Sequence, residues 1–178
     1  DFLIGSLDKE ATLYFGGRDL DALDSLRFPA PYEEASRYGA TLAGLGDFTG
    51  DGYDDIVIGA FGDYSQSGAG GRVFIYYGGE EMDSSWDRHV RGRQAGESAG
   101  WPVVSPGDVN GDGLSDLLLG APDHVKVGDG GGNVFAGEAR LYLGVDGAIP
   151  GIDVTYVGPA PETSQAFGIG LGRSMRVE

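Results

Sequence analysis

Residues 44–60 read GLGDFTGDGYDDIVIGA, and residues 105–121 read SPGDVNGDGLSDLLLGA. The two stretches align without a gap at an offset of 61 positions. The chain opens on DFLIGS, which matches the end of the same unit, with Asp1 in the place of Asp55 and Asp116. Because self-similarity at a fixed period is the mark of repeat architectures, the chain is expected to repeat one structural unit.

Two further landmarks recur in the same order. An aromatic landmark that ends in glycine occurs at residues 13–16 (LYFG), 75–78 (IYYG) and 141–144 (LYLG). A serine landmark with an aromatic residue and a glycine occurs at residues 36–39 (SRYG), 98–101 (SAGW) and 164–168 (SQAFG). Together the landmarks divide the chain into units at residues 1–35, 36–97, 98–163 and 164–178.

Each unit is predicted to hold four short strands, because its apolar runs are too short for helices and are flanked by glycine. The first strand of the unit is predicted at Ala40–Leu45 and Trp101–Val104, and the second at Asp55–Ala60 and Asp116–Ala121. The third is predicted at Arg72–Tyr77 and Glu138–Leu143, and the fourth at Ser25–Phe28, Trp86–Arg91 and Asp153–Val157. The linkers Gly62–Gly71 and Asp123–Gly137 are predicted to be surface loops. A repeated four-stranded antiparallel sheet is typical of a β-propeller blade, so the predicted fold is all-β, with about three blade units.

The number of units leaves the closure of the ring open, because propellers close with about four to eight blades. In one interpretation residues 1–178 are a single region of a longer propeller. In the other, several copies of the chain assemble into a ring, and the strand predicted at residues 164–178 completes a blade of another copy.

Oxygen-bearing side chains are spaced as metal ligands in two loops. Side chains at loop positions 1, 3, 5 and 9 converge when the backbone wraps tightly, a glycine at position 6 allows the turn, and position 7 offers its carbonyl oxygen. The predicted ligands are Asp47, Thr49, Asp51, Tyr53 and Asp55 in the first loop and Asp108, Asn110, Asp112, Leu114 and Asp116 in the second. Oxygen donors without His or Cys favour Ca²⁺, and Mg²⁺ or Mn²⁺ less.

A structural alternative is that the loops are Asx turns, in which Asp and Asn side chains bind their own backbone. That alternative does not explain why three carboxylates, which repel one another at short range, crowd into nine residues twice. Thr49 replaces a carboxylate or amide, so the first site is expected to be the weaker one. Asp1 lacks upstream ligands in this sequence and is not assigned to a third site.

The order of an aromatic-glycine pair, an Asp-x-Asn-x-Asp-Gly-x-x-Asp loop and a run into Gly-Ala-Pro resembles the FG-GAP repeat of integrin α-subunits and related proteins. Residues 120–122 match its second signature, whereas Phe61 stands in the place of the proline and residues 100–101 invert the aromatic-glycine order. The resemblance implies a seven-bladed propeller with structural calcium in loops between the first and second strands of some blades. It also implies that partners bind the opposite face or the rim.

Composition excludes several classes of partner. The formal charge of −16 argues against nucleic acids, whose binding requires clustered Lys and Arg, and against anionic lipid surfaces. No apolar run approaches the roughly 20 residues that span a bilayer, so direct membrane insertion is not expected. No signal peptide is visible at the start of the chain. The absence of Cys excludes disulfides and thiolate metal sites.

Residues 96–100 (GESAG) match the nucleophile-elbow pattern, but that motif needs a preceding strand and a following helix, so Ser98 is assigned to a turn. His89 and His124 lack a metal-ligand spacing and are predicted at the surface or a strand edge. The sequence therefore predicts an extracellular or cell-surface recognition or adhesion module with two calcium sites. Its ligand is an unidentified protein or carbohydrate. The alternatives are a purely architectural propeller segment and an enzyme that acts on polysaccharides or lipids.

Overall fold

The computed structural model describes residues 1–7, 10–17, 24–33, 35–63, 70–127, 131–145 and 154–158. Within these residues the chain forms strands and no helix, so no helix there could cross a membrane. The strands are β1 (Phe2–Ser6), β2 (Glu10–Tyr14), β3 (Ser25–Pro29), β4 (Tyr38–Gly46), β5 (Asp55–Ala60), β6 (Arg72–Tyr76), β7 (Arg88–Arg91), β8 (Val103–Gly107), β9 (Asp116–Ala121), β10 (Val125–Val127), β11 (Asn133–Phe135), β12 (Glu138–Tyr142) and β13 (Val154–Val157).

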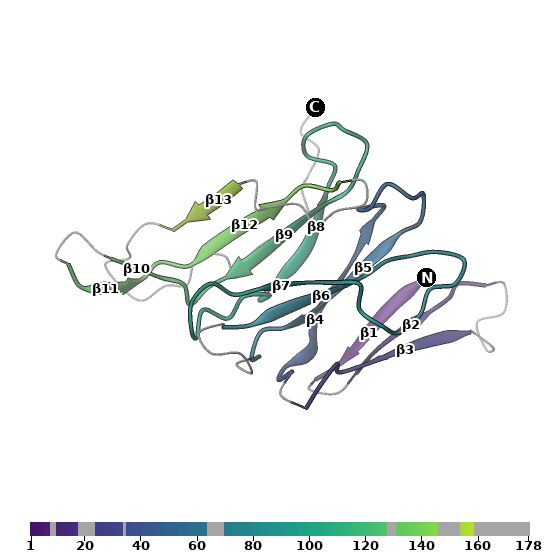
Figure 1. Ribbon diagram of the computed structural model, residues 1–178, viewed down its shortest axis with the longest axis horizontal. Coiled ribbons are helices and arrows are strands. Elements are labelled where there is room, and N and C mark those ends of the chain that lie inside the picture. The colour runs from purple at the N-terminus through teal and green to yellow at the C-terminus, as the bar shows by residue number, and fades with distance from the viewer. Residues whose placement is uncertain are drawn as a thin grey trace.

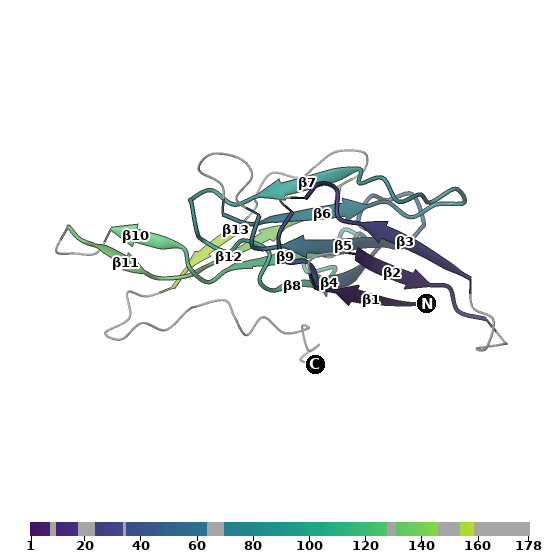
Figure 2. The ribbon, with the colours of Figure 1, turned by 90° about the horizontal axis from the view of Figure 1, so that it is seen from below.

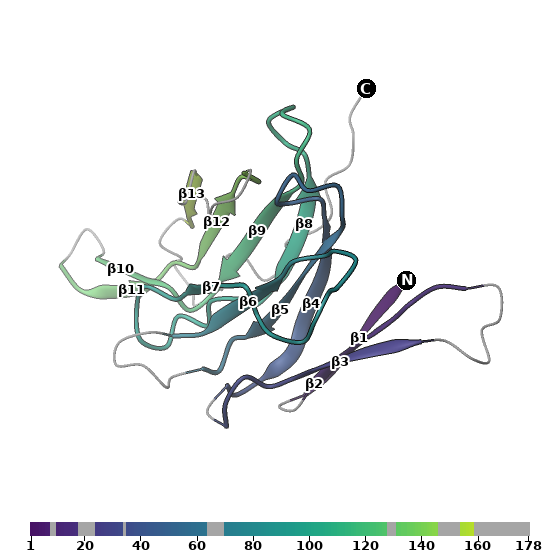
Figure 3. The same cartoon turned by 45° about the vertical axis from the view of Figure 1, so that its right-hand side comes forward.

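Three antiparallel sheets follow one another along the chain and lie side by side (Figure 1). We call them blade A (order β1-β2-β3), blade B (β4-β5-β6-β7) and blade C (β8-β9-β12-β13). Figure 3 shows β4 and β8 next to each other where blades B and C meet. Each four-stranded sheet has the sequential strand order of a propeller blade, which confirms the predicted fold class.

The central strands of blade B are buried on both faces, so their side chains alternate between two hydrophobic cores. Ile56, Ile58 and Phe74 pack with residues of blade A. Val57 and Val73 pack instead with residues of blade C. This double burial explains why the two strands read as nearly continuous apolar runs in the sequence.

Most predicted strands lie where the sequence placed them, and Asp55–Ala60 and Asp116–Ala121 match β5 and β9 at both ends. The prediction of a surface loop at Asp123–Gly137 was wrong in part, because β10 and β11 pair there as an antiparallel hairpin. Figure 2 shows this hairpin extending away from the three blades. Asp153 and the strand predicted at residues 164–178 lie outside the described residues.

The backbone corrects the inverted aromatic-glycine landmark. Trp101 N–H binds the carbonyl oxygen of Ser98 as Ala40 N–H binds that of Arg37, so the offset of 61 positions continues through this turn. Gly100 therefore corresponds to Gly39, both with positive φ. At the same offset Ala99 occupies the core position of Tyr38, and Trp101 occupies the exposed position of Ala40.

Candidate metal centres

The first acidic loop, residues 47–55, wraps around the side chain of its first aspartate. Asp47 Oδ1 accepts a hydrogen bond from Gly50 N–H at 2.6 Å, and its Oδ2 accepts one from Gly52 N–H at 3.0 Å. Asp51 Oδ1 accepts one from Tyr53 N–H at 2.9 Å. Gly50 and Gly52 have φ values of 80° and 89°, which glycine adopts without the steric cost that a Cβ brings.

The second acidic loop, residues 108–116, repeats this geometry. Asp108 accepts from Gly111 N–H at 2.6 Å and from Gly113 N–H at 2.8 Å, and Asp112 accepts from Leu114 N–H at 2.9 Å. The hydrogen bond from Gly113 is the largest of several that lower the pKa of Asp108. The carboxylate at position 1 is therefore held as an anion at neutral pH.

The last aspartate of each loop is buried and tied to backbone N–H groups. Asp55 Oδ2 accepts from the N–H groups of Phe48 and Thr49, and its Oδ1 accepts from Gly78 N–H at 2.8 Å. Burial raises the pKa of Asp55 to about 6, against the lowering effect of these N–H groups, and the charge of nearby Asp51 raises it further.

The same tie recurs in all three units. Asp116 Oδ1 accepts from Gly144 N–H at 2.9 Å, and Asp1 Oδ1 accepts from Gly16 N–H at 2.5 Å. In each unit the final aspartate therefore joins the start of one strand to the glycine of the aromatic landmark. A Cβ on Gly144 would lie 2.4 Å from the carbonyl oxygen of Ser115, which explains the need for glycine there.

The donor set fits a hard cation. The side chains supply oxygen donors only, and the hydroxyl Oγ1 of Thr49, at position 3 of the first loop, is buried without a hydrogen-bond partner among the described residues. That oxygen is available to a bound ion. The loop carboxylates nevertheless point to N–H groups of their own loops and do not converge as a tight group within the described part of the chain.

A different group of side chains does converge, at the junction of blades B and C. Ligand atoms of Glu97, His124 and Glu138 all lie within 4.8 Å of one another. His124 Nδ1 is 2.9 Å from Glu97 Oε2 and 3.0 Å from Glu138 Oε2. The prediction that His124 lies at the surface or a strand edge was wrong, because His124 is only 9% exposed. His89 does lie in β7, the outer strand of blade B.

Arg140 forms ion pairs with both carboxylates of this group. We call Glu97, His124, Glu138 and Arg140 the junction network. Arg140 Nε is 2.6 Å from Glu138 Oε1, and Arg140 NH2 is 2.8 Å from Glu97 Oε1. Burial alone would lower the pKa of Arg140, but its hydrogen bonds and charge interactions with Glu138 and Glu97 hold the pKa above its usual value. A fixed cation among the carboxylates opposes the binding of a metal ion, so the junction network is an ion-pair cluster.

The repeat explains why sequence reasoning missed the network. At the offset of 61, Asp63 of blade B stands where His124 stands in blade C. Asp63 forms an ion pair with Arg72, the first residue of β6, and His124 contacts Glu138, the first residue of β12. In blade B the carboxylate of the pair follows the second strand, whereas in blade C a carboxylate stands at the start of the third strand. Ser98, the residue of the nucleophile-elbow pattern, lies in the adjoining turn and donates its hydroxyl to Asp123 at 2.6 Å.

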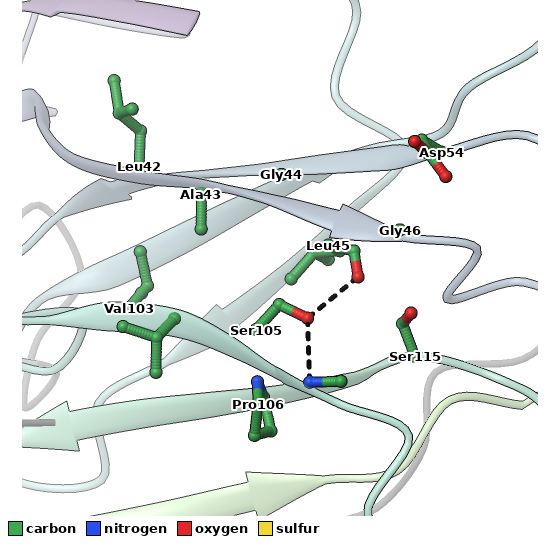
Figure 4. A pocket seen from close by; sticks show the side chains of 12 residues that line it. Leu42, Ala43, Gly44, Leu45, Gly46, Asp54, Val103, Ser105, Pro106 and Ser115 are labelled. Carbon is green, nitrogen blue, oxygen red and sulfur yellow. Dashed lines mark hydrogen bonds between the residues drawn. The ribbon is translucent and has the colours of Figure 1, made fainter. Parts of the chain in front are cut away.

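A groove of about 660 Å³ runs between β4 and β8. Figure 4 shows small and apolar side chains along it, with Ser105 bound to the carbonyl oxygen of Leu45 at 2.9 Å. Asp54 is the one titratable residue that lines it. The groove therefore offers no acid–base pair for catalysis.

Comparisons with known proteins agree with the repeat pattern. The chain matches the model of the FG-GAP-like repeat family over residues 47–119. It is 29% identical to integrin alpha-5 of Xenopus laevis over 158 residues. The aligned region covers 84% of this chain and 14% of that protein. The chain is 32% identical over 105 residues to integrin alpha-PS3 of Drosophila melanogaster, which covers 55% of this chain and 9% of that protein.

A relative of another kind also matches. The chain is 33% identical over 129 residues to the human phosphatidylinositol-glycan-specific phospholipase D, which covers 71% of this chain and 14% of that protein. The chain thus spans between 9% and 14% of the length of these three relatives.

Proposed function

The chain carries FG-GAP-like repeats of the integrin α type folded as β-propeller blades, and we propose that it is a recognition or adhesion module stabilised by calcium. The observation that carries the calcium proposal is the shared geometry of the two acidic loops around Asp47 and Asp108. Two segments of different sequence fold alike because the ligand positions and glycines coincide. The unpartnered Oγ1 of Thr49 supports the proposal further.

The proposed ligands are those of the loop positions. They are Asp47, Thr49, Asp51, Asp55 and the carbonyl of Tyr53 in the first loop, and Asp108, Asn110, Asp112, Asp116 and the carbonyl of Leu114 in the second. A bound Ca²⁺ would supply positive charge that offsets the mutual repulsion of three carboxylates. The loop residues join β4 to β5 and β8 to β9, so binding that favours their folded arrangement would stabilise both blades.

Calcium affinity bears on where the module works. Calcium modules of extracellular proteins commonly bind at about 10⁻⁴–10⁻³ M, and we propose an affinity in that range for these loops. We therefore propose an extracellular or cell-surface location, where millimolar calcium is present. At ten times the dissociation constant, one site would add about 1.4 kcal/mol to the free energy of unfolding.

Thermal unfolding with and without calcium tests the proposal. Calcium is expected to raise the Tm of chelator-treated protein. Either Asp51→Asn or Asp112→Asn is expected to remove part of that rise. Asp54→Asn is the matched control, because Asp54 is an exposed carboxylate of the first loop at a position that is not a proposed ligand. A Tm that calcium leaves unchanged after complete chelation contradicts the calcium sites, and magnesium in place of calcium tests the choice of ion.

We propose a binding role rather than an enzymatic one. The phospholipase relative shares only 14% of its length with this chain, so its activity is not assigned here. The partner is proposed to be a protein or a carbohydrate and not a nucleic acid, because the chain has a charge of −16. A solution-mass measurement tests whether copies of the chain associate into a ring.

A further inference from the structure

The outer strand of blade B has one unpaired edge. β7 ends the strand order of this blade, so its far edge pairs with no other strand among the described residues. Figure 2 shows β7 along the upper margin of the blades, with β6 beneath it. Gly92 N–H donates to the carbonyl oxygen of Gly71 at 2.9 Å, so this is a hydrogen-bonded pair. Such pairs alternate with non-hydrogen-bonded ones in an antiparallel ladder, so the peptide groups of His89 and Arg91 point away from β6.

Basic side chains gather along this edge of a strongly acidic chain. Arg88, Arg91 and Arg93 lie within six positions, although the chain has 28 acidic and only 12 basic residues. Arg93 NH1 is 3.0 Å from Glu138 Oε1, whereas neither Arg88 nor Arg91 forms an ion pair with another described residue. Because successive side chains of a strand point to opposite faces, Arg88 and Arg91 place one unneutralised positive charge on each face of blade B.

The contacts of these two arginines leave donors for a ligand. Arg88 NH1 donates to the carbonyl oxygen of Asp87 at 3.1 Å, and the guanidinium carbon lies 6.0 Å from the ring centroid of Tyr77. Arg91 Nε donates to His89 Nε2 at 3.1 Å. A guanidinium has five N–H groups, so both arginines keep donors for a carboxylate. Burial, and after it the charges of two arginines, lower the pKa of His89, as expected where positive charge is concentrated.

An exposed aromatic ring lies just before the start of β7. Trp86 is 41% exposed, and its ring meets that of His89 edge to face, with the centroids 5.0 Å apart. Its centroid is also 6.0 Å from that of the buried ring of Phe74. The indole is therefore held against blade B and still presents surface to solvent. Trp and Arg are among the residues that most often dominate the energy of protein interfaces, and here they lie along one strand.

Charged side chains on an edge strand commonly serve to prevent pairing with other chains. That explanation fits this edge poorly, because copies of a chain with a charge of −16 already repel one another, whereas arginines attract acidic surfaces. Blade A has a more direct protection. Pro29 of β3 stands opposite Glu10, in the place that Arg91 of β7 holds opposite Arg72, and a proline presents no N–H to a partner strand. The edge of blade B lacks this protection.

We propose that the outer edge of β7 binds an extended acidic segment of a partner protein, which adds to blade B as a further strand. The peptide groups of His89 and Arg91 offer N–H and C=O groups in the alternation that a peptide backbone complements. Directly opposite residues share a face and lie about 5 Å apart. The partner is therefore expected to carry acidic side chains three positions apart, opposite Arg88 and Arg91.

Other occupants fit these observations less well. A sulfated sugar meets the arginines but does not present donors and acceptors at the spacing of a strand. Antiparallel pairing with β7 of a second copy would bring arginine next to arginine, and like charges directly opposite each other are destabilising. An acidic peptide segment satisfies both the backbone edge and the charges.

This inference rests on the proposed recognition role and does not depend on calcium binding. Protein labelled with ¹⁵N is titrated, in millimolar calcium, with the peptide Ser-Val-Glu-Thr-Thr-Glu-Val-Ser, and its amide resonances are recorded. Saturable shifts of the His89 and Arg91 N–H resonances are expected, because both groups gain a hydrogen-bond acceptor. The affinity should fall as salt is raised, since salt screens exposed charges. The same peptide with lysine in place of both glutamates is the matched control and is expected not to bind.

Two variants separate charge from backbone pairing. Arg88→Glu is expected to weaken peptide binding by roughly tenfold or more, whereas Arg27→Glu makes the same charge change at an exposed position of β3 and should leave binding unchanged. Arg91→Pro removes both the outward N–H and the guanidinium and is expected to abolish the shifts. Pro29 at the equivalent position of β3 shows that such an edge accepts proline.

The proposal is overturned if the acidic peptide does not bind, or if Arg88→Glu binds it as well as the parent chain does. It is also overturned if a heparin octasaccharide shifts the His89 and Arg91 resonances at lower concentration than the peptide, which would assign the edge to a polyanion. A doubled solution mass that Arg91→Pro abolishes would assign the edge to a second copy and overturn it too. A chain whose Tm rises with calcium but that does not bind the peptide rejects the β7 proposal and leaves the proposed calcium sites standing.

Discussion

The carbonyl oxygen of Asp47 accepts a hydrogen bond of 2.8 Å from the backbone N–H of Ser115. The first residue of one acidic loop is thereby attached to the second loop, in the neighbouring blade. Val145 N–H also binds the carbonyl oxygen of Phe48 at 3.2 Å. The two proposed calcium sites are consequently parts of one connected segment of structure.

This connection predicts that the two sites influence each other. Asp112→Asn is expected to weaken calcium binding at the second loop by about tenfold or more. At the first loop it should weaken binding by a smaller factor of about two to five, which corresponds to a coupling free energy of about 0.4–1 kcal/mol. Calorimetric titration of the variant measures both affinities. Asp51→Asn should show the reciprocal effect, and an unchanged affinity of the intact loop in both variants would exclude coupling.

The buried and exposed aspartates of one loop are predicted to have different roles. Asp55→Asn places an amide next to N–H groups that need an acceptor, so it should lower the free energy of unfolding by about 1–3 kcal/mol even without calcium. Urea unfolding in excess chelator measures this loss. Asp51→Asn, at an exposed position, should change stability in chelator by less than about 0.5 kcal/mol. Equal losses in the two variants would contradict the assignment.

The hydroxyls of Tyr38 and Tyr76, 2.6 Å apart in the core between blades A and B, predict sensitivity to alkali. Burial raises the pKa of Tyr38 far above its usual value and that of Tyr76 to about 12. Because these folded-state pKa values exceed the unfolded value near 10, the pair contributes its full stability below pH 10. That contribution is lost as pH rises from 10 towards 12.

Urea unfolding between pH 8 and 12 measures the alkaline loss. In Tyr38→Phe the free energy of unfolding should fall less steeply with pH, because one of the two buried groups no longer titrates. It should also cost about 1 kcal/mol at pH 8 through the lost hydrogen bond. Tyr53→Phe, at an exposed position, is the control. A fall in stability that is the same in all three proteins would assign it to other groups.

The blades could be predicted because their determinants are local. The apolar runs of β5 and β9, and the aspartates and glycines between paired strands, lie within a few residues of one another and recur in the sequence. The hairpin of β10 and β11 could not be predicted in this way. Its strands are three residues long, and Val125 and Val127 give too short an alternation to distinguish them from a loop.

Features that depend on distant partners were hidden in the sequence. The place of Trp101 follows from backbone hydrogen bonds, whereas the letters alone showed only an inverted aromatic-glycine order at residues 100–101. The burial of His124 depends on Glu97, which lies 27 positions before it, and on Glu138, in a different strand. Residue spacing cannot reveal a cluster assembled from three separate segments.

The junction network is predicted to stabilise the contact between blades B and C by ion pairing and not by a metal. Arg140→Met leaves the buried carboxylates of Glu97 and Glu138 without their main cation, so it should cost about 3–5 kcal/mol. Adding Glu97→Gln and Glu138→Gln to Arg140→Met removes the unpaired charges and should recover part of that loss. Chemical unfolding of the single and triple variants measures both steps. If Zn²⁺ raises the Tm of the parent chain, and His124→Gln abolishes the rise, the network is a metal site and the ion-pair assignment is wrong.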